Sequence, residues 1–407
     1  MIAPPTLMPL PSETELRILI LSAAVPQTWY AGSLLLYRLL QHQPPHALKA
    51  VGPRPQAASE TLGCEYVELL PAASSRLDLT RFAELKRSLQ AVSAVGRIAD
   101  GRVDAAVAEF AADVVVSLME RFDYVEAAHR FCQRRGLPLA LIVHDRLESF
   151  EHVYPAFAGA QRRRFASVYR DAAARFCISP EMEQRLSTEY GAHGTVLYPN
   201  RSEELVPRPV LDSAALKSPP LLTIGYAGAM NYGYGERLRA VMPLLAGAGF
   251  TLRVYSREAP PAIDGVVYGG SFRRTRDLWD RVQSECDLVW LPYSHSPEFR
   301  PLYETHFPSK LTEYLALGMP TLITGPSYAT GVRWGVQHPE AAVTLVDERP
   351  EQVLEALIAL RDQASRRQQL ASGALSAGER DFNPVNIRTS FLDTLRATSR
   401  RPVRVAS

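Results

Sequence analysis

The most informative segment of the chain is Thr305–Gly318, which reads Thr-His-Phe-Pro-Ser-Lys-Leu-Thr-Glu-Tyr-Leu-Ala-Leu-Gly. It predicts a loop that leads into a short helix, because Pro308 stands where a helix begins. Ser309 follows as a residue that can accept hydrogen bonds from the first free N–H groups. Gly318 and Pro320 then form a stop signal, so the helix is expected to end just before them.

The short helix divides its residues between an apolar and a polar face. Leu311, Tyr314 and Leu315 are expected to face a core, whereas Lys310 and Glu313 are three apart and share another face. A Lys in the first turn opposes the helix dipole unless an anion lies there. Free N–H groups beside a Lys are a phosphate-binding arrangement, and Glu313 is then placed to bind hydroxyls of the phosphate carrier. The alternative is an ordinary capped helix with solvated charges.

The composition of the whole chain is that of a globular protein. Its 407 residues are 46% hydrophobic and 22% charged, which provides enough chain for two sizeable cores. The formal net charge of +2 gives no strong attraction to nucleic acid, so no nucleic-acid partner is expected. The four Cys match no metal or disulfide spacing, and no apolar run reaches the ~18 residues that span a bilayer. A cytoplasmic protein is expected, with peripheral membrane contact left open.

Short apolar runs alternate with helix-like segments twice along the chain, which predicts two parallel sheets covered by helices. The first series of strands is expected at 16–24, 46–52, 66–70, 113–118, 139–143, 175–178 and 196–198. The second series is expected at 221–227, 251–255, 266–268, 287–291, 321–324 and 343–346. The helices are expected at 33–41, 79–110 with a break near Gly101, 124–135, 158–174, 180–190, 234–246, 276–285, 350–371 and 386–396.

These segments predict an α/β protein with two doubly wound, Rossmann-like domains. The expected parts are a flexible tail (1–15), an N-terminal domain (16–205), a Pro-rich linker (206–220), a C-terminal domain (221–383) and a final helix with a tail (384–407). Ligands of such sheets bind outside the carboxyl ends of the strands, so the two domains are expected to face each other across a cleft. The loops after residues 24, 143, 227 and 291 and the segment 304–310 are therefore the expected site.

Five pieces of this sequence resemble the GT-B glycosyltransferases of the retaining, family 4-like type, especially their polysaccharide-synthesis members. The specific piece is Phe307–Pro320, which resembles the donor helix of that family. The other pieces are Gly225–Gly228, Asp287–Tyr293, Cys177–Met182 with Tyr198–Asn200, and His144 after a strand. The resemblance covers residues 16–375 and implies an N-terminal acceptor-binding domain and a C-terminal domain that binds a nucleotide sugar.

The resemblance also implies roles for single residues of the donor site. Lys310, helped by N–H groups near Ser309, would contact the diphosphate, and Glu313 would bind the ribose hydroxyls. The other implied donor residues are Gly228, Ala229 and Met230 in a turn that approaches the phosphates, Ser271 and Phe272 beside the nucleobase, and Arg257 near it.

The N-terminal domain is implied to supply the groups around the transferred sugar. His144 would orient the donor sugar or the acceptor by hydrogen bonds, and Asp145 would share that task. Gly32, in the loop after the first strand, would lie near the donor phosphate or the acceptor. The alternative for His144 is a strand-end residue that satisfies only local backbone groups, and for Asp145 a helix cap.

The expected chemistry needs neither a cofactor nor a metal. No Asp-x-Asp pair occurs in the sequence, so a diphosphate held by a metal ion is not expected. Lys310 and the helix N-terminus would instead stabilise the charge that develops on the leaving diphosphate. The expected donor is a UDP- or GDP-type nucleotide sugar, and the acceptor a saccharide, a lipid-linked sugar or another small molecule.

Three departures from the family pattern keep two alternatives open. Thr305 stands where the family commonly has the first of two Glu, and Ala31 and Gly32 replace its usual Gly-Gly pair. The segment Asn231–Tyr234 replaces the usual Arg and Lys, which leaves Lys310 as the main cation for two phosphates. A non-catalytic partner subunit that binds nucleotide sugars therefore remains an alternative, as does a nucleotide-sugar epimerase of the same fold.

Overall fold

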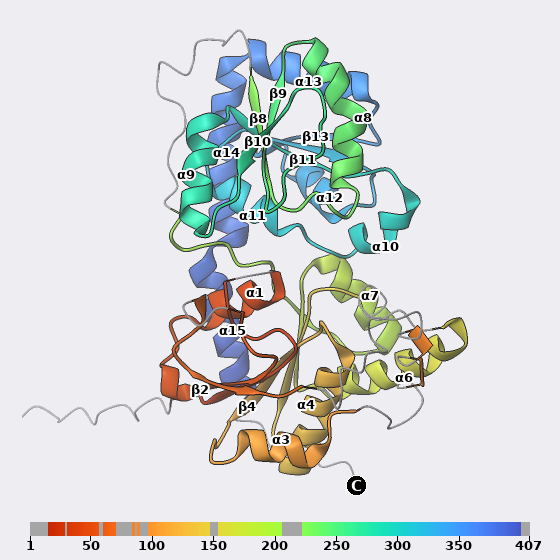
Figure 1. Ribbon diagram of the computed structural model, residues 1–407, viewed down its shortest axis with the longest axis vertical. Coiled ribbons are helices and arrows are strands. Elements are labelled where there is room, and N and C mark those ends of the chain that lie inside the picture. Colours follow the sequence, from red (N-terminus) through yellow and green to blue (C-terminus); the bar gives the residue numbers. More distant parts are fainter. Residues whose placement is uncertain are drawn as a thin grey trace, which may run out of the picture.

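The computed structural model describes residues 15–28, 31–56, 60–70, 84–85, 88–89, 97–146, 154–205 and 222–399. Two domains are stacked along the long axis of the molecule, with the N-terminal domain at the bottom of Figure 1. The expected linker at 206–220 lies outside the described residues, as do the two tails except for Glu15.

The N-terminal domain is built on a seven-stranded parallel sheet in the order β3-β2-β1-β4-β5-β6-β7. Its central strands are buried at every position, which is why they appear in the sequence as continuous apolar runs. The strands are β1 (Ile18–Leu21), β2 (Leu48–Gly52), β3 (Glu65–Glu68), β4 (Val114–Leu118), β5 (Leu139–Val143), β6 (Ala174–Cys177) and β7 (Thr195–Val196).

The helices of this domain cover both faces of the sheet. They are α1 (Ala31–Leu40), α3 (Asp100–Val107), α4 (Phe122–Arg135), α6 (Pro155–Asp171) and α7 (Pro180–Tyr190), with a 3-10 turn η1 (Pro45–Ala47) before β2. The long helix expected at 79–110 lies largely outside the described residues. Its described end is α3, which begins at Asp100 after the non-helical residues 97–99, so the break predicted near Gly101 is confirmed.

The C-terminal domain has a six-stranded parallel sheet in the order β10-β9-β8-β11-β12-β13. Its strands are β8 (Thr223–Ala227), β9 (Thr251–Tyr255), β10 (Val266–Gly270), β11 (Leu288–Pro292), β12 (Thr321–Gly325) and β13 (Ala342–Val346). Both predicted sheets are therefore present, and two Rossmann-like domains are confirmed.

The helices of the C-terminal domain flank its sheet as expected, with one difference. They are α8 (Tyr234–Gly247), α9 (Thr275–Glu285), the 3-10 turn η4 (Pro297–Phe299), α10 (Arg300–Tyr303), α11 (Ser309–Ala316), α12 (Thr330–Gln337), α13 (Pro350–Asp362) and α14 (Ala364–Phe382). The single helix predicted at 350–371 is wrong, because Gln363 leaves the helical conformation and separates α13 from α14.

The last helix, α15 (Pro384–Ser399), returns to the N-terminal domain. It runs downward in Figure 1 and packs near α1, β4 and β6, with the Phe391 ring centroid 5.0 Å from that of Phe176. A proline cannot continue the helical hydrogen bonds of α14, so Pro384 starts a new helix. The two domains are thus joined covalently at two places, after β7 and before α15.

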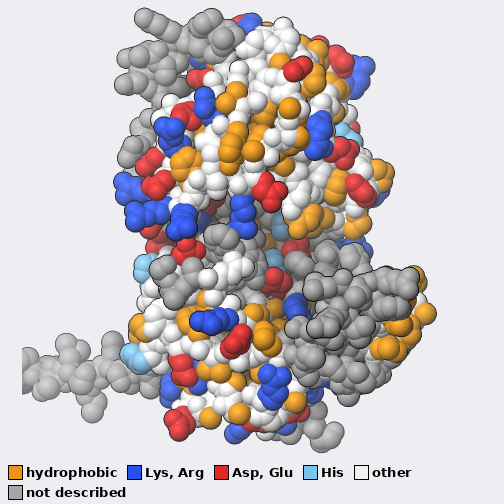
Figure 2. Space-filling view, viewed as in Figure 1, with side chains coloured by type: hydrophobic (Ala, Val, Ile, Leu, Met, Phe, Trp, Pro, Cys, Tyr) orange, Lys and Arg blue, Asp and Glu red, His pale blue; other side chains and the backbone are white. Residues whose placement is uncertain are grey.

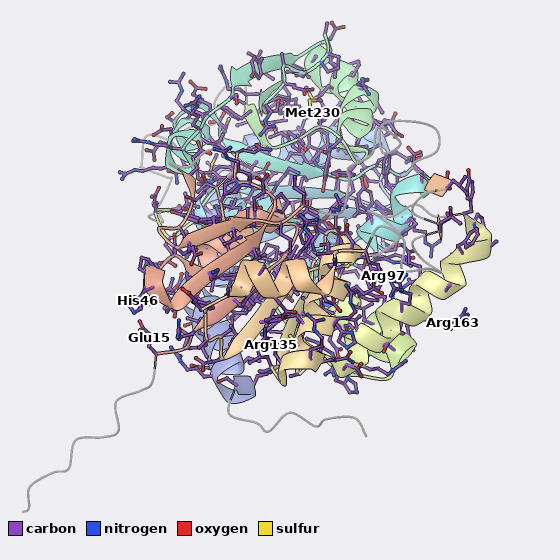
Figure 3. All side chains as sticks on the ribbon, turned by 60° about the horizontal axis from the view of Figure 1, so that its bottom comes forward. Glu15, His46, Arg97, Arg135, Arg163 and Met230 are labelled. Atoms are coloured by element: carbon purple, nitrogen blue, oxygen red, sulfur yellow. The ribbon has the colours of Figure 1, made fainter. Side chains whose placement is uncertain are left out.

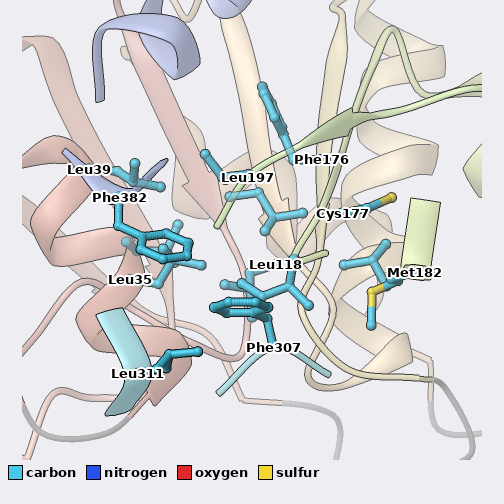
Figure 4. Close-up of a cluster of buried hydrophobic side chains, with 14 of the residues drawn as sticks. Leu35, Leu39, Leu118, Phe176, Cys177, Met182, Leu197, Phe307, Leu311 and Phe382 are labelled. Carbon is cyan, nitrogen blue, oxygen red and sulfur yellow. The ribbon is translucent and has the colours of Figure 1, made fainter. Parts of the chain in front are cut away.

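A shared apolar cluster joins the facing ends of the two domains. Figure 4 shows Leu35 and Leu39 of α1 in one cluster with Leu311 of α11 and Phe307 just before it. Tyr198 contributes to the same junction, because its ring centroid lies 4.8 Å from that of Phe307. Since apolar burial is non-directional and roughly proportional to area, this cluster holds the domains together without determining any chemistry.

Candidate active site

A cavity of about 250 Å³ lies between the two domains and takes side chains from both. Five residues with a predicted role line it: His144, Gly228, Ser309, Lys310 and Glu313. Residues without a predicted role also line it, chiefly Arg38 of α1, Asn200 after β7, Thr275 and Trp279 of α9, and His306 before α11.

Helix α11 enters the cavity with the arrangement expected from its sequence, except at its cap. Leu311, Tyr314 and Leu315 are fully buried, as predicted. The N-cap residue is Pro308, which cannot cap through a side-chain hydrogen bond, so the predicted capping role of Ser309 is wrong. Ser309 is instead the first helical residue and remains exposed at the edge of the cavity.

Lys310 points from the first turn of α11 toward two tyrosine rings. Its Nζ lies 4.1 Å from the ring centroid of Tyr234 and 5.5 Å from that of Tyr226, which are cation–π distances. Burial lowers the pKa of the Lys310 ammonium to about 8, and no carboxylate in the described part of the chain offsets this. A partly buried ammonium with no carboxylate partner is well placed to bind an anionic ligand.

The absence of a side chain at Gly228 leaves room for the side chain of Lys310. The φ of 125° at Gly228 is a conformation that other residues rarely adopt, and a Cβ at this position would collide with Cε of Lys310. The turn after β8 therefore lies directly against the side chain of Lys310. The role of this turn in phosphate binding stays a prediction.

Glu313, one turn further along α11, is paired with a cation of the other domain. Its Oε1 lies 2.7 Å from Nη2 of Arg38, and only 7% and 8% of the two side chains are exposed. The backbone N–H of Ser202 donates to the same oxygen at 3.4 Å. The second carboxylate oxygen, Oε2, is buried without a hydrogen-bond partner, while Glu313 lines the cavity.

His144 and Asp145 lie at the end of β5 and meet His306 of the C-terminal domain. Oδ2 of Asp145 is 3.4 Å from Nε2 of His144, and its Oδ1 is 3.1 Å from Nδ1 of His306. Burial lowers the pKa of His144, so its neutral imidazole is favoured. Burial alone would also lower the pKa of His306, but the carboxylate of Asp145 outweighs it and raises that pKa above its ordinary value.

The carboxylate of Asp145 is the shared partner of this cluster. Burial alone would raise its pKa, but His306 and His144 beside it lower the pKa below the ordinary value. A charged carboxylate that contacts a histidine from each domain fixes both rings in place.

Gly32 lies against His144 rather than in the cavity lining. A Cβ on Gly32 would come within 3.3 Å of Cε1 of His144 and 3.2 Å of Cδ2 of Leu118. The missing side chain therefore leaves room for the imidazole, and contact of Gly32 with an acceptor stays a prediction.

The remaining predicted donor residues are not among the residues that line the cavity. Ala229 and Met230 follow Gly228 on the way to α8, where Figure 3 labels Met230. Ser271, Phe272 and Arg257 follow β10 and β9, which form the edge of the C-terminal sheet. Their roles in donor binding stay predictions.

The exposed surface beside this sheet edge is basic. Figure 2 shows Lys and Arg side chains gathered on the α9 side of the upper lobe, just above the waist between the lobes. Arg273, Arg274 and Arg276 are exposed residues of this region. Such a surface favours the approach of an anionic ligand.

Arg38, Asn200 and His306 are the site residues that sequence reasoning assigned to no defined role. The sequence around Arg38 could have indicated that this residue has a specific partner, because it stands among leucines in Ala31–Leu40 and a buried Arg needs a partner. Nothing in the local pattern points to the position of that partner in another domain.

The described segments bear on metal binding and on membrane insertion. No group of three or more His, Cys, Asp or Glu side chains there is arranged to hold a metal ion. Among the helices of these segments, none has both the length and the apolar character that a bilayer-crossing helix needs.

Solved structures resemble this chain over nearly its whole length. HepE from Anabaena in complex with UDP shares 14% identity, covers 94% of this chain and 100% of its own, and superposes with a TM-score of 0.66. Sucrose-phosphate synthase from Thermosynechococcus elongatus shares 12% identity over 93% of this chain and 98% of its own, with a TM-score of 0.65. A glycosyltransferase from Rickettsia africae shares 10% identity over 95% of this chain and 100% of its own, with a TM-score of 0.66.

These similarities establish the fold. The chain has the GT-B architecture, in which two Rossmann-like domains face each other. Neither a family model nor a curated relative matches the sequence.

Proposed function

We propose that this chain is a glycosyltransferase that moves a sugar from a nucleoside diphosphate sugar to a saccharide, a glycolipid or another small acceptor. We further propose that it belongs with the family 4-like enzymes, retains the anomeric configuration and works without a metal ion. The observation that carries the proposal is the partly buried ammonium of Lys310, which lies in a cavity between two domains and against the glycine turn at Gly228. HepE, which has this fold, was solved with UDP-glucose bound.

The charge balance of the cavity suits a leaving diphosphate. When the bond between the sugar carbon and the phosphate oxygen breaks, negative charge grows on the diphosphate, and Lys310 with the free N–H groups of α11 stabilises it. The acceptor oxygen forms the new bond on the same face of the sugar, and the departing phosphate oxygen takes its proton. No strong protein base is required in this scheme.

The cluster of His144, Asp145 and His306 would act on the sugar rather than on the phosphates. Asp145 holds both rings, and the lowered pKa of His144 keeps its imidazole neutral and able to donate or accept one hydrogen bond at each nitrogen. Its proposed role is to orient a sugar hydroxyl so that the acceptor oxygen reaches the reacting carbon.

A non-catalytic subunit that binds nucleotide sugars is the second candidate. The specific observation in its favour is that Tyr234, from the segment that replaces the family's usual Arg and Lys, occupies the space beside the Lys310 ammonium. One cation would then face two phosphates, which is enough for binding but weakens the stabilisation of a leaving group.

Calorimetry with UDP and GDP, combined with donor hydrolysis and transfer assays, tests the proposal. We expect the wild-type protein to bind one of them and Lys310→Ala to weaken that binding at least tenfold, about 1.4 kcal/mol. Arg281→Ala, an exposed cation on α9, is the matched control and should leave the dissociation constant unchanged. An unchanged constant in Lys310→Ala would refute the phosphate site.

The activity assays separate the two candidates and test the finer claims. Binding without hydrolysis or transfer to any acceptor would favour the non-catalytic subunit. NMR of the product anomer tests retention. Activity should persist in EDTA, and a loss that Mg²⁺ or Mn²⁺ restores would contradict metal independence.

A further inference from the structure

Tyrosines from four parts of the C-terminal domain pack together beside Lys310, and we call them the tyrosine wall. At most 6% of any of these tyrosines is exposed. They are Tyr226 of β8, Tyr234 at the start of α8, Tyr293 directly after β11 and Tyr303 at the end of α10. The ring centroid of Tyr234 lies 5.9, 5.8 and 6.3 Å from those of the other three, in the same order. Tyr234 is therefore the central ring of the wall.

Hydrogen bonds attach the chain before Tyr234 to the same wall. The hydroxyl of Tyr226 donates to the backbone oxygen of Ala229 at 2.5 Å. The hydroxyl of Tyr303 donates to the backbone oxygen of Tyr232. The segment between β8 and α8 is thus held at two backbone oxygens, so the ring of Tyr234 is placed both by its neighbouring rings and by its own backbone.

The ammonium of Lys310 lies between this wall and the interdomain cavity. Its Nζ is 4.1 Å from the ring centroid of Tyr234 and 5.5 Å from that of Tyr226. Lys310 lines the cavity, whereas these two tyrosines are not among the lining residues. The turn at Gly228 restricts the lysine further, because a Cβ there would lie 2.3 Å from its Cε. The rings therefore contact the ammonium from the protein side, and a ligand in the cavity can approach it from the other.

An aromatic ring holds an ammonium differently from a carboxylate. The face of the ring carries partial negative charge and attracts a cation, but the ring has no net charge and does not neutralise it. A carboxylate in the same place would form an ion pair with the lysine and would repel a phosphate. An ammonium on the face of Tyr234 therefore keeps its full charge for an anion that arrives from the cavity.

We infer that Tyr234 is a positioning residue for the donor diphosphate, because its ring face holds the ammonium of Lys310 at the cavity and stays in contact with it when the diphosphate binds. The segment Asn231–Tyr234, which lacks the Arg and Lys expected from the family resemblance, thus compensates by fixing the one lysine that is present. The inference rests on the proposed function and adds to it the residue that places the lysine.

The test changes the electron density of this ring while nearly keeping its shape. Phenylalanine and its 4-fluoro, 3,5-difluoro and 3,4,5-trifluoro derivatives replace Tyr234, because each fluorine draws electrons from the ring face and weakens its attraction for a cation. The probes are UDP or GDP, whichever the wild type binds more tightly, and the corresponding nucleoside. Calorimetry gives the dissociation constant of the diphosphate, and NMR titration gives that of the nucleoside. The ratio of the two constants isolates the contribution of the phosphates.

Tyr234→Phe should keep this ratio within about twofold of the wild-type value, because the ring is retained. Along the fluorine series the preference for the diphosphate should fall stepwise, by at least about fivefold between phenylalanine and its trifluoro derivative. Tyr234→Leu, which removes the ring, should lower it at least as far. Affinity for the nucleoside should stay the same throughout, because the ring acts only through the lysine.

Tyr293 provides the matched control within the tyrosine wall. Its ring packs against that of Tyr234, whereas Lys310 lies over the rings of Tyr234 and Tyr226. The same series at position 293 alters a buried ring of the wall that has no ammonium on its face in the described structure. The preference for the diphosphate should therefore stay constant along that series.

The outcomes separate this inference from the proposed function. A preference that is constant or rises along the series at Tyr234, or that falls equally along the series at Tyr293, would overturn the role of Tyr234 and leave the proposed function intact. Failure of the wild-type protein to bind either UDP or GDP would overturn both. A ratio measured within one variant does not depend on how much of that protein is folded, so a destabilised variant still gives an answer.

Discussion

Two ion pairs cross between the domains at the cavity, and they differ in chemistry and burial. Arg38 and Glu313 form one pair, whose side chains are 8% and 7% exposed. Asp145 and His306 form the other, whose side chains are 13% and 30% exposed. Only the second pair contains a histidine, the side chain whose charge ordinarily changes near neutral pH.

The difference indicates a division of tasks within one cavity. The Arg38–Glu313 pair is buried and joins α1 to α11 beside the cavity. The Asp145–His306 pair is more exposed, and Asp145 also contacts His144. The charge of His306, whose pKa is raised, changes with pH. Substitutions that remove one pair or the other, or that change Lys310, are considered below, and those with the greatest expected effect come first.

Breaking the buried pair should cost the most. Glu313→Ala leaves the guanidinium of Arg38 buried without a carboxylate, and we expect the free energy of unfolding to fall by about 3–5 kcal/mol. Urea denaturation measures it. Arg38→Met combined with Glu313→Leu should recover most of the loss, because an apolar pair of similar volume replaces the charges. A single variant as stable as the double variant would show that the pair is not buried in solution.

Removing the imidazole of His144 should affect turnover more than donor affinity. We expect His144→Ala to lower kcat at least tenfold, about 1.4 kcal/mol in the barrier, while KM for the donor stays within about twofold. Steady-state kinetics with the hydrolysed donor provides the measurement, and His193→Ala, a highly exposed histidine, is the control. Equal losses in affinity and turnover would indicate that His144 only supports the fold.

Affinity for the diphosphate should depend on pH through Lys310. Burial lowers the pKa of this lysine to about 8 in the free protein, and a bound anion must raise it. Binding is therefore at full strength below about pH 8 and weakens above it, by at most about tenfold per pH unit. Calorimetry across this range tests the slope.

Substitution at Lys310 gives the control for this pH dependence. Lys310→Arg should bind with an affinity that stays flat above pH 8, because a guanidinium keeps its proton. A wild-type affinity that does not change with alkaline pH would contradict the buried, unpaired state of the lysine.

Breaking the accessible pair should have the smallest effect, and the effect should depend on pH. The pKa of His306 is raised above its ordinary value, so its pairing with Asp145 stabilises the protein fully below about pH 6.5 and is lost as pH rises through the raised pKa. Asp145→Asn should cost about 1 kcal/mol or less at acidic pH and progressively less at alkaline pH. Thermal unfolding at several pH values tests this, and a constant difference would contradict it.

Much of the fold could be predicted because its signals are local. Val114–Leu118 and Leu139–Val143 are buried strands of a parallel sheet, and such strands appear as unbroken apolar runs. The first turn of α11 could also be predicted, since Pro308 and Lys310 are neighbours in the chain. The break at Gln363 could not, because no Gly or Pro marks it and the packing of α13 and α14 decides it.

Local signals in the chain were enough to predict two parallel sheets, the helix α11 and a lysine in its first turn, because hydrophobic periodicity and helix signals act over a few residues. The pairing of Arg38 with Glu313, the contact of Asp145 with His306 and the place of Asn200 in the cavity lining emerged only from the folded arrangement of the domains. The physical reason is that the partner of a buried charge depends on which strand ends and helix faces meet when the domains close. No residue spacing along the chain indicates which of these side chains will come into contact.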